Sequence, residues 1–384
     1  MAKQLIPQLR FPFFKDEWSI HKLKDISKVY DGTHQTPKYV SDGIPFYSVE
    51  HISANQFEKT KFISKEVFEK ENKRVKLEKG DILMTRIGSI GVSKYIDWDV
   101  NASFYVSLAL IKKVSSYDSR YLNQFINSDF FQKELWKRTI HVAFPIKINL
   151  GEIGECLTVL PSLPEQQKIA SFFSDVDLVI TKLTKKKDLL EQYKKGTMQK
   201  IFSQELRFQD DNGYEFPKWE KTVLGKISNI TTGSSNRQDS GLNGEFTFFD
   251  RSEDIRTSSR YLFDGEAIIV AGEGSDFIPK YYIGKFDLHQ RTYAIMDFEE
   301  VISKYLFYYI HFHRRYFLSQ AVGSTVKSLR LPMFKKMPIK LPAKEEQNKI
   351  ANFLSDIDLK IEALQTKIEN SKAFKKGLLQ QMFV

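Results

Sequence analysis

Two pairs of aspartates, one in each half of the chain, are the first candidates for chemistry. Asp175 and Asp177 are matched by Asp356 and Asp358, with one residue between the members of each pair. Paired carboxylates bind a metal ion or share a proton only when both point into one site. Residues two positions apart on a helix point to different sides. The spacing therefore favours solvated or partner-facing charge over a metal site.

Other motifs with catalytic associations are incomplete. His311 and His313 lie among aromatic residues, where we expect them to pack. Ala271-Gly272-Glu273-Gly274 lacks the third glycine and the βαβ context of a nucleotide-binding turn. The chain has no Gly-Lys-Ser/Thr of a P-loop, and no Ser/His/Asp set can be defined. It also has no Pro-Pro pair, which the base-holding motif of adenine methyltransferases requires. We predict no catalytic centre.

The composition is that of folded domains with a basic surface. A length of 384 residues suggests two or more domains, and 41% hydrophobic residues suffice to fold them. The net charge of +10, from 58 Lys and Arg against 48 acids, favours a polyanionic partner, although many basic proteins bind no nucleic acid. The single cysteine, Cys156, excludes an intramolecular disulfide and a Cys-based zinc cluster. With neither a signal-peptide pattern nor 18 consecutive apolar residues, we expect a cytoplasmic protein without membrane contact.

An internal repeat gives the organisation of the chain. The segment from Leu160 to Ser203 aligns without gaps to the segment from Leu341 to Val384, at a constant offset of 181. A second match, at an offset of 201, pairs the segment from Trp18 to Gly32 with that from Trp219 to Gly233. Between these anchors the halves diverge, although Gly80-Asp81-Ile82-Leu83 resembles Gly265-Glu266-Ala267-Ile268. We predict variable domains over 1–160 and 204–341, and shared helical regions over 161–203 and 342–384.

The shared regions have the heptad spacing of long paired helices. The apolar positions of the second are Ile350, Leu354, Ile357, Ile361, Leu364 and Ile368. Those of the first are Ile169, Phe173, Val176, Ile180 and Leu183, after which Lys187 interrupts and Leu190 resumes. Each helix would leave its apolar stripe in water unless the other covered it, which predicts an antiparallel intramolecular coiled coil. The variable domains mix short β-rich runs with turns, so we predict an α+β fold.

Two features of the helical regions have more than one interpretation. Gly196 and Gly377 occupy equivalent positions and indicate a bend, a close backbone contact or a helix end. Five lysines crowd the first helical region, where they could attract DNA, form a solvated face or contact a partner protein: Lys185, Lys186, Lys187, Lys194 and Lys195.

At these motifs the sequence resembles the specificity subunits of type I restriction–modification systems. The family's Pro-Leu-Pro-x-Glu-Gln-x-x-Ile-Ala stretch stands here as Pro161-Ser162-Leu163-Pro164-Glu165-Gln166-Gln167-Lys168-Ile169-Ala170. The second copy departs from it, since Lys344-Glu345 replaces Leu163-Pro164. The Trp-x4-Leu-x2-Ile-Ser-x4-Gly opening of each half and the Arg86-x-Gly88-x-x-Gly91 stretch also resemble the family. The resemblance covers essentially the whole chain.

The resemblance implies a non-catalytic DNA reader. The variable domains would be two target-recognition domains, each reading one half of a bipartite, asymmetric duplex site, with the helices setting the spacer. Two methyltransferase (modification) subunits and two motor-nuclease (restriction) subunits would assemble with the chain. Adenine methylation, ATP-driven translocation and cleavage would belong to them, and no cofactor would bind this chain. S-adenosylmethionine, ATP and Mg²⁺ would bind those partners.

Polar residues in predicted loops are the candidates for DNA contact, because their side chains suit base edges or phosphates. In the first domain they are Thr33, His34, Gln35, Thr36, Arg86, Ser89 and Asn101. In the second they are Ser234, Ser235, Asn236, Arg237, Gln238, His289, Gln290, Arg291, Ser324 and Lys327. Partner-binding candidates lie in the shared regions: Glu165, Gln166, Asp175, Asp177, Glu346, Gln347, Asp356 and Asp358. Two alternatives remain, a fused modification enzyme with its own recognition domains and a duplicated coiled-coil scaffold that binds other proteins.

Overall fold

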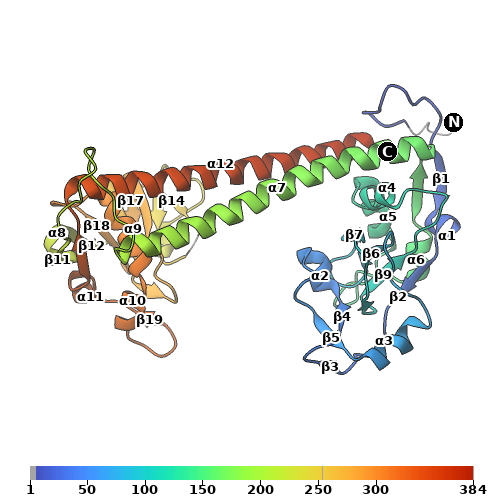
Figure 1. Ribbon diagram of the computed structural model, residues 1–384, viewed down its shortest axis with the longest axis horizontal. Coiled ribbons are helices and arrows are strands. Elements are labelled where there is room, and N and C mark those ends of the chain that lie inside the picture. Colours follow the sequence, from blue (N-terminus) through green and yellow to red (C-terminus); the bar gives the residue numbers. More distant parts are fainter. Residues whose placement is uncertain (1–5, 253, 384) are drawn as a thin grey trace. The chain divides into compact units, whose positions relative to one another are not determined.

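The computed structural model describes residues 6–252 and 254–383 and divides into two compact units (Figure 1). Unit 1 comprises Met1–Leu183 and Thr366–Val384, and unit 2 comprises Thr184–Gln365. The two long helices, α7 (Leu163–Phe202) and α12 (Lys344–Met382), each contribute a part to both units. None of the described helices is long and apolar enough to span a membrane.

The globular part of unit 1 contains two four-stranded sheets and one β-ribbon. The first sheet has the order β2 (Val29–Asp31), β9 (Leu108–Ile111), β6 (Ile82–Thr85) and β7 (Ser93–Tyr95). The second has the order β3 (Tyr39–Val40), β5 (Lys61–Ile63), β4 (Ile44–Tyr47) and β8 (Ser103–Phe104). The ribbon pairs β1 (Ser19–Lys22) antiparallel with β10 (Leu157–Leu160). Its helices are α1 (Leu23–Ile26), α2 (Val49–Ala54), α3 (Lys65–Asn72), α4 (Ser119–Ile126), α5 (Asp129–Arg138) and α6 (Leu150–Gly154).

The core of unit 1 lies on both faces of its central strands. Every residue of β6 and β9 is buried, so these strands are apolar without alternation. One face packs against α4, α5 and the parts of α7 and α12 in this unit (Figure 1). The other face packs against Tyr47, Ile52 and Phe104. Asp118 caps the N-terminus of helix α4, because its carboxylate accepts the N–H groups of Arg120 and Tyr121.

The main sheet of unit 2 has six strands. Its order is β12 (Asn229–Thr232), β18 (Thr292–Met296), β15 (Phe263–Ala271), β17 (Lys280–Leu288), β13 (Phe246–Phe249) and β14 (Arg256–Ser258). Two ribbons pair β11 (Glu220–Val223) with β20 (Pro338–Leu341), and β16 (Glu273–Gly274) with β19 (Lys327–Ser328). The helices are α8 (Leu224–Ile227), the 3-10 turn η1 (Arg237–Asp239), α9 (Ser303–His313), α10 (Arg315–Gln320) and α11 (Leu331–Lys335). Both globular parts are therefore α+β, as predicted.

The two long helices pair antiparallel within each unit, which confirms the prediction. In unit 1 the rings of Phe173 and Phe383 stack with centroids 5.7 Å apart, and Asp177 forms a 2.8 Å ion pair with Lys375. From the first contact to the second, the residue number rises along α7 and falls along α12, so the helices run in opposite directions. In unit 2, Lys194 forms a 2.5 Å ion pair with Asp358. Both pairs are equivalent under the 181-residue offset of the repeat.

Two of the interpretations of Gly196 and Gly377 need correction, whereas Lys187 interrupts the apolar pattern as predicted. Gly196 and Gly377 both lie inside helices that continue past them, and an added Cβ would meet no atom within 4 Å at either position. They mark neither a helix end nor a close backbone contact. The Nζ of Lys187 forms a 3.0 Å ion pair with Glu191 of its own helix.

One predicted correspondence between the halves is shifted by a residue. The sheets place Ile82 opposite Ile111 and Ile268 opposite Ile295. Ile82 therefore corresponds to Ile268, and Asp81 corresponds to Ala267 rather than to Glu266. The similar turn residues Gly80-Asp81 and Gly265-Glu266 led to the wrong alignment. The shift matters because one residue moves each side chain to the other face of the strand.

Candidate nucleic-acid interface

In unit 2, loops that are distant in sequence meet at one edge of the sheet. The segment that follows β12 forms a parallel bridge from Ser235 to His289, just beyond the end of β17. The Gln290 N–H donates to the Ser235 carbonyl at 3.0 Å, and the Gln290 Nε2 donates to Asn236 Oδ1 at 2.8 Å. We call this set of loops the loop edge of unit 2; it contains residues 233–240, 250–252, 272–276, 289–291 and 322–328.

A buried aspartate fixes this edge from inside. Asp287 is fully buried and accepts the hydroxyls of Ser235 at 2.6 Å and Ser258 at 2.7 Å. Ser235 is itself fully buried, so its predicted contact with DNA is wrong, because its hydroxyl serves the loop's own structure. The other candidates of this segment remain accessible: Ser234, Arg237 and Gln238 are exposed, and Asn236 is half-buried.

A second buried carboxylate, Asp250, supports the same edge. Arg237 Nη1 lies 3.6 Å from Asp250 Oδ2. Burial acts to raise the pKa of Asp250, but hydrogen bonds from Ser252 and the charge of Arg237 hold it below its ordinary value. Burial is also the main cause that lowers the pKa of the neighbouring His289. His289 therefore favours the neutral form, whose Nδ1 accepts the Arg291 N–H at 3.1 Å.

The remaining unit 2 candidates join this edge through a short ribbon. Strand β16 pairs with β19 so that Glu273 lies opposite Ser328 and Gly274 lies opposite Lys327. Ser324, Lys327 and Arg291 are all exposed. All ten candidates of unit 2 therefore lie on the loop edge or support it.

Unit 1 has an equivalent edge, built with different side chains. Thr33 bridges to Tyr105, as Ser235 bridges to His289. Asp31, at the end of β2, accepts His34 Nε2 at 2.8 Å and also bonds to the guanidinium of Arg74. Burial acts to raise the pKa of Asp31, but the bonds from Arg74 and His34 lower it below its ordinary value. We call the loops 31–36, 86–91, 105–107 and 141–147 the loop edge of unit 1.

Two candidates of unit 1 are structural rather than exposed. Arg86 is buried, and its Nε and Nη1 donate to the carbonyls of Ile148 at 3.1 Å and Val106 at 2.8 Å. Thr33 is buried and donates its hydroxyl to Glu71 at 2.8 Å. Their predicted contacts with DNA are not supported, because both side chains are largely buried and bonded to other parts of unit 1. His34, Gln35, Thr36, Ser89 and Asn101 are exposed.

The sequence prediction missed residues 141–147 of unit 1. Lys147 bridges to Ile87 and Ile140, and the Gly88 N–H donates to the Ile146 carbonyl at 2.8 Å. The segment occupies the place that 322–328 occupies in unit 2, and Phe144 at its centre is fully exposed. Extending the 181-residue offset upstream of Leu160 pairs Lys147 with Ser328 and would have found it.

Comparison with known proteins identifies the family. A family model described as "Type I restriction modification DNA specificity domain" matches residues 15–192 and 211–371, which is most of the chain. The chain belongs to this family. It is a type I restriction–modification specificity subunit, and the family recognises DNA sequence through target-recognition domains.

Individual relatives agree with the family model. The chain is 25% identical over 398 residues to a Methanocaldococcus jannaschii protein assigned as the MjaX type I specificity subunit, covering 95% of this chain and 92% of that one. It is 28% identical over 153 residues to the Escherichia coli EcoDI specificity subunit, but this match covers 39% of the chain and only 34% of that protein.

A solved structure supports the fold. The type I S subunit from M. genitalium is 14% identical to this chain and superposes with a TM-score of 0.65, covering 98% of this chain and 99% of that one. A likeness at this identity shows the fold of the specificity subunit alone.

Four of the predicted partner-binding residues lie inside this specificity subunit. Glu165 accepts Arg10 Nε at 2.8 Å and Trp18 Nε1 at 3.3 Å, and Glu346 accepts Arg207 Nε at 3.1 Å and Trp219 Nε1 at 3.0 Å. We call these the glutamate clusters of units 1 and 2. Gln166 and Gln347 accept the N–H groups of Asp118 and Ile302.

This burial corrects their predicted role. Glu165, Gln166, Glu346 and Gln347 are buried, so they hold each globular domain on the start of a long helix and offer no surface to another chain. Asp177 and Asp358 bond to the lysines of the opposite helix but stay partly exposed. Asp175 and Asp356 are exposed and remain predicted partner contacts.

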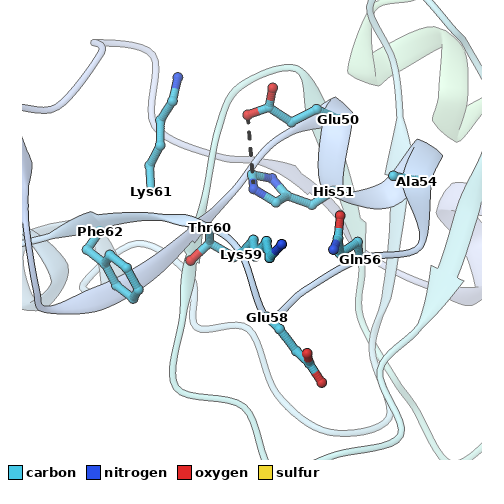
Figure 2. A pocket seen from close by; sticks show the side chains of 9 residues that line it. All are labelled: Glu50, His51, Ala54, Gln56, Glu58, Lys59, Thr60, Lys61 and Phe62. Atoms are coloured by element: carbon cyan, nitrogen blue, oxygen red, sulfur yellow. Dashed lines mark ion pairs between the residues drawn. The ribbon is translucent and has the colours of Figure 1, made fainter. Parts of the chain in front are cut away.

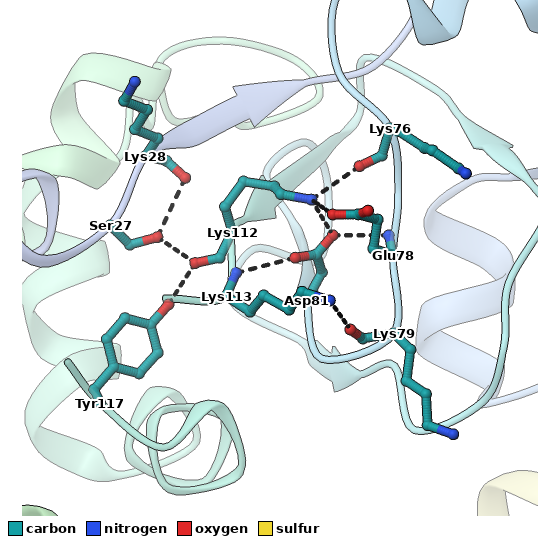
Figure 3. Close-up of polar contacts among 9 residues, drawn as sticks. All are labelled: Ser27, Lys28, Lys76, Glu78, Lys79, Asp81, Lys112, Lys113 and Tyr117. Carbon is teal, nitrogen blue, oxygen red and sulfur yellow. Dashed lines mark hydrogen bonds and ion pairs between the residues drawn. The ribbon is translucent and has the colours of Figure 1, made fainter. Parts of the chain in front are cut away.

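Two further polar sites of unit 1 lie away from the candidate residues. Figure 3 shows buried Asp81, which accepts Lys112 Nζ at 2.7 Å and the N–H groups of Glu78 and Lys113. This network fixes the turn into β6, at the opposite end of that strand from Arg86.

An open pocket of about 710 Å³ lies beside α2. Figure 2 shows the residues that line it, among which His51 Nε2 lies 4.0 Å from Glu50. Among the described residues, no three His, Cys, Asp or Glu are grouped to hold a metal ion.

Proposed function

We propose that this chain recognises a bipartite, asymmetric duplex DNA site, with the loop edge of each unit reading one half. The observation that supports this proposal is the construction of the two edges. Gly32 packs against the Phe104 carbonyl as Gly233 packs against the Leu288 carbonyl, and an added Cβ would lie 2.0 and 1.7 Å from those oxygens. The same backbone thus presents different side chains, which suits two unlike half-sites.

The chemistry of the complex belongs to other subunits in this proposal. The chain binds two methyltransferase subunits and two motor-nuclease subunits, and it directs adenine methylation and restriction without catalysing either. S-adenosylmethionine, ATP and Mg²⁺ bind those partners. A structure entitled "Structural basis underlying complex assembly and conformational transition of the type I R-M system" has a TM-score of 0.52 to this chain, which supports its likeness to a subunit of such an assembly. The exposed Asp175 and Asp356 are the proposed docking residues.

Methylome sequencing tests this proposal directly. A host that expresses this chain with its methyltransferase should carry methylated adenines in a two-part motif, which disappears when this gene alone is deleted. A variant with Arg237→Ala and Gln238→Ala should alter only one half of the motif. Gln35→Ala in unit 1 is the matched control and should alter only the other half. A contiguous motif would contradict the bipartite site. Methyl transfer by the purified chain alone would contradict the proposal and favour a fused enzyme.

A further inference from the structure

One carboxylate on the loop edge of unit 2 holds two arginines. Glu273 Oε2 lies 3.2 Å from Arg251 Nη1, and Glu273 Oε1 pairs with Arg291 Nη1. The side chain of Glu273 is only 12% exposed, whereas those of Arg251 and Arg291 are 57% and 63% exposed. A partly buried anion thus lies behind two cations that face solvent.

The backbone fixes this carboxylate relative to Arg291. Glu273 lies in β16, opposite Ser328 of β19, whose hydroxyl donates to Glu273 Oε1 at 3.4 Å. On the preceding residue, the Gly272 N–H donates to the Arg291 carbonyl at 2.8 Å, and the Gly272 carbonyl accepts the Leu329 N–H at 2.7 Å. A Cβ at Gly272 would lie 2.7 Å from the Arg291 carbonyl oxygen, so this approach requires glycine. The ribbon therefore holds the backbone of Glu273 beside Arg291, so its carboxylate lies within reach of both arginines.

The arrangement suits the edge of a base better than a phosphate. Each guanidinium bonds to Glu273 through Nη1, so the donors on its other side remain directed away from the carboxylate. Two such donors match the O6 and N7 acceptors of guanine in the major groove. A phosphate, in contrast, would be repelled by Glu273, and the carboxylate offsets one of the two positive charges.

We infer that Glu273 is a positioning residue that holds Arg251 and Arg291 as a guanine-reading pair in the half-site of unit 2. The inference rests on the proposed function, because it assumes that this edge faces DNA. It assigns to Arg251 and Glu273 a part in specificity that their sequence positions alone did not indicate.

Because Glu273 is negatively charged, removing its charge should strengthen binding to random duplex DNA. Glu273→Gln keeps the size of the side chain but removes the charge that restrains both arginines. The freed guanidinium groups should then bind phosphates, so affinity for random duplex should rise and its salt dependence should steepen by about one counterion. Discrimination against substitution of the read guanine should fall by about 10- to 100-fold. A purely structural role would weaken specific and random binding together.

The test uses the chain assembled with its methyltransferase subunits and duplexes that carry the methylated motif. Replacing each guanine of the unit 2 half-site by 7-deazaguanine removes only the N7 acceptor. At the read position this should weaken wild-type binding at least 10-fold, and should change binding by Glu273→Gln or Arg291→Ala less than 2-fold. Asp211→Asn is the control, since Asp211 pairs with Lys349 at 2.6 Å outside the loop edge and should retain wild-type discrimination.

The outcomes separate the inference from the proposed function. No 7-deazaguanine effect at any position of this half-site, or loss of random binding by Glu273→Gln, would overturn the inference while leaving sequence-specific binding intact. Equal binding of wild-type complex to all duplexes would instead contradict the proposed function. Thermal melting of each variant shows whether a loss of binding reflects unfolding, and Arg291→Lys, which keeps the charge but not the paired donors, then decides. It should retain affinity for random duplex and lose the response to 7-deazaguanine.

Discussion

The two recognition domains differ in the strand that supports their loop edges. In unit 2 the nine-residue strand β17 pairs antiparallel with β15 and then parallel with β13. In unit 1 two short strands replace it: β7 pairs antiparallel with β6, and β8 pairs parallel with β4. One six-stranded sheet in unit 2 thus corresponds to two four-stranded sheets in unit 1. The strand's end, which carries Phe104 or Leu288 against a glycine, is nevertheless the same.

This difference shows which contacts tolerate divergence. The strand β17 can be replaced by the separate strands β7 and β8, because each of these still pairs with a neighbouring strand. The end of β17 or β8, in contrast, must meet the loop that carries the candidate contacts. The glutamate clusters show the opposite limit, since both keep an arginine, a tryptophan and a buried glutamate in the same arrangement. The predictions that follow ask how far the units are equivalent, beginning with the clusters.

Removing either cluster glutamate should have the largest effect. Glu165→Ala and Glu346→Ala each leave a partly buried arginine and a buried indole N–H without their acceptor, which should cost about 3–5 kcal/mol in the free energy of unfolding. Hydrogen exchange can follow the two units separately, and each variant should lose protection in its own unit. Glu345→Ala, at an exposed neighbouring position, is the control. Costs that differ by more than about 2 kcal/mol would show that the clusters are not equivalent.

Arg86 should distinguish the two loop edges by stability. It corresponds to Gly272, since the N–H groups of Arg86 and Gly272 donate to the carbonyls of Ser107 and Arg291. Arg86→Ala removes the donors from one buried and one partly buried carbonyl and should destabilise unit 1 by about 2–4 kcal/mol. Ser89→Ala, nearby and exposed, should change stability by less than about 0.5 kcal/mol. If Arg86→Ala changes the methylated motif without changing the urea midpoint, Arg86 reads DNA after all.

Acid should destabilise unit 2 more than unit 1. Burial among aromatic rings lowers the pKa of His313 to about 4, and among the described residues its Nε2 has no hydrogen-bond partner. Between pH 6.5 and 4 the unfolded chain binds a proton that the folded chain excludes, so stability falls as the pH falls through this range. At about 1.4 kcal/mol per pKa unit, the penalty at pH 4 is about 2–3 kcal/mol.

Replacing this histidine should reduce the difference. Helix α4, the counterpart of α9 in unit 1, contains no histidine. His313→Phe should therefore weaken the pH dependence of urea unfolding in unit 2, while the lowered pKa values of His289 and His311 leave part of it. His34→Phe, at an exposed position in unit 1, is the control and should leave the acid response of unit 2 unchanged. An unchanged acid response in His313→Phe would mean that other groups cause it.

Features that depend on residues close in sequence were predictable, whereas features that depend on distant residues were not. The heptads of α7 and α12 and their antiparallel pairing depend on local periodicity and duplication, and both were predictable. Arg86, Thr33 and Ser235 were misplaced because polar residue types in a loop do not reveal burial, which depends on carbonyls and carboxylates from distant segments. Glu165 and Glu346 failed for the same reason, since their arginine and tryptophan partners lie more than a hundred residues away. Arg251 and Glu273 were missed because only the fold brings them to Arg291.

The smallest effects should come from the ion pairs between the long helices. Lys194–Asp358 and Lys375–Asp177 are partly exposed, so each should contribute about 0.2–1 kcal/mol in a double-mutant cycle. Their surroundings differ, because the Tyr308 hydroxyl donates to Asp358 at 2.7 Å whereas Gln124 Nε2 donates to Asp177 at 3.0 Å. Both coupling energies should decrease in 0.5 M salt, because screening weakens exposed pairs. A coupling above about 2 kcal/mol in one pair alone would mean that the helix pairing has diverged along with the recognition domains.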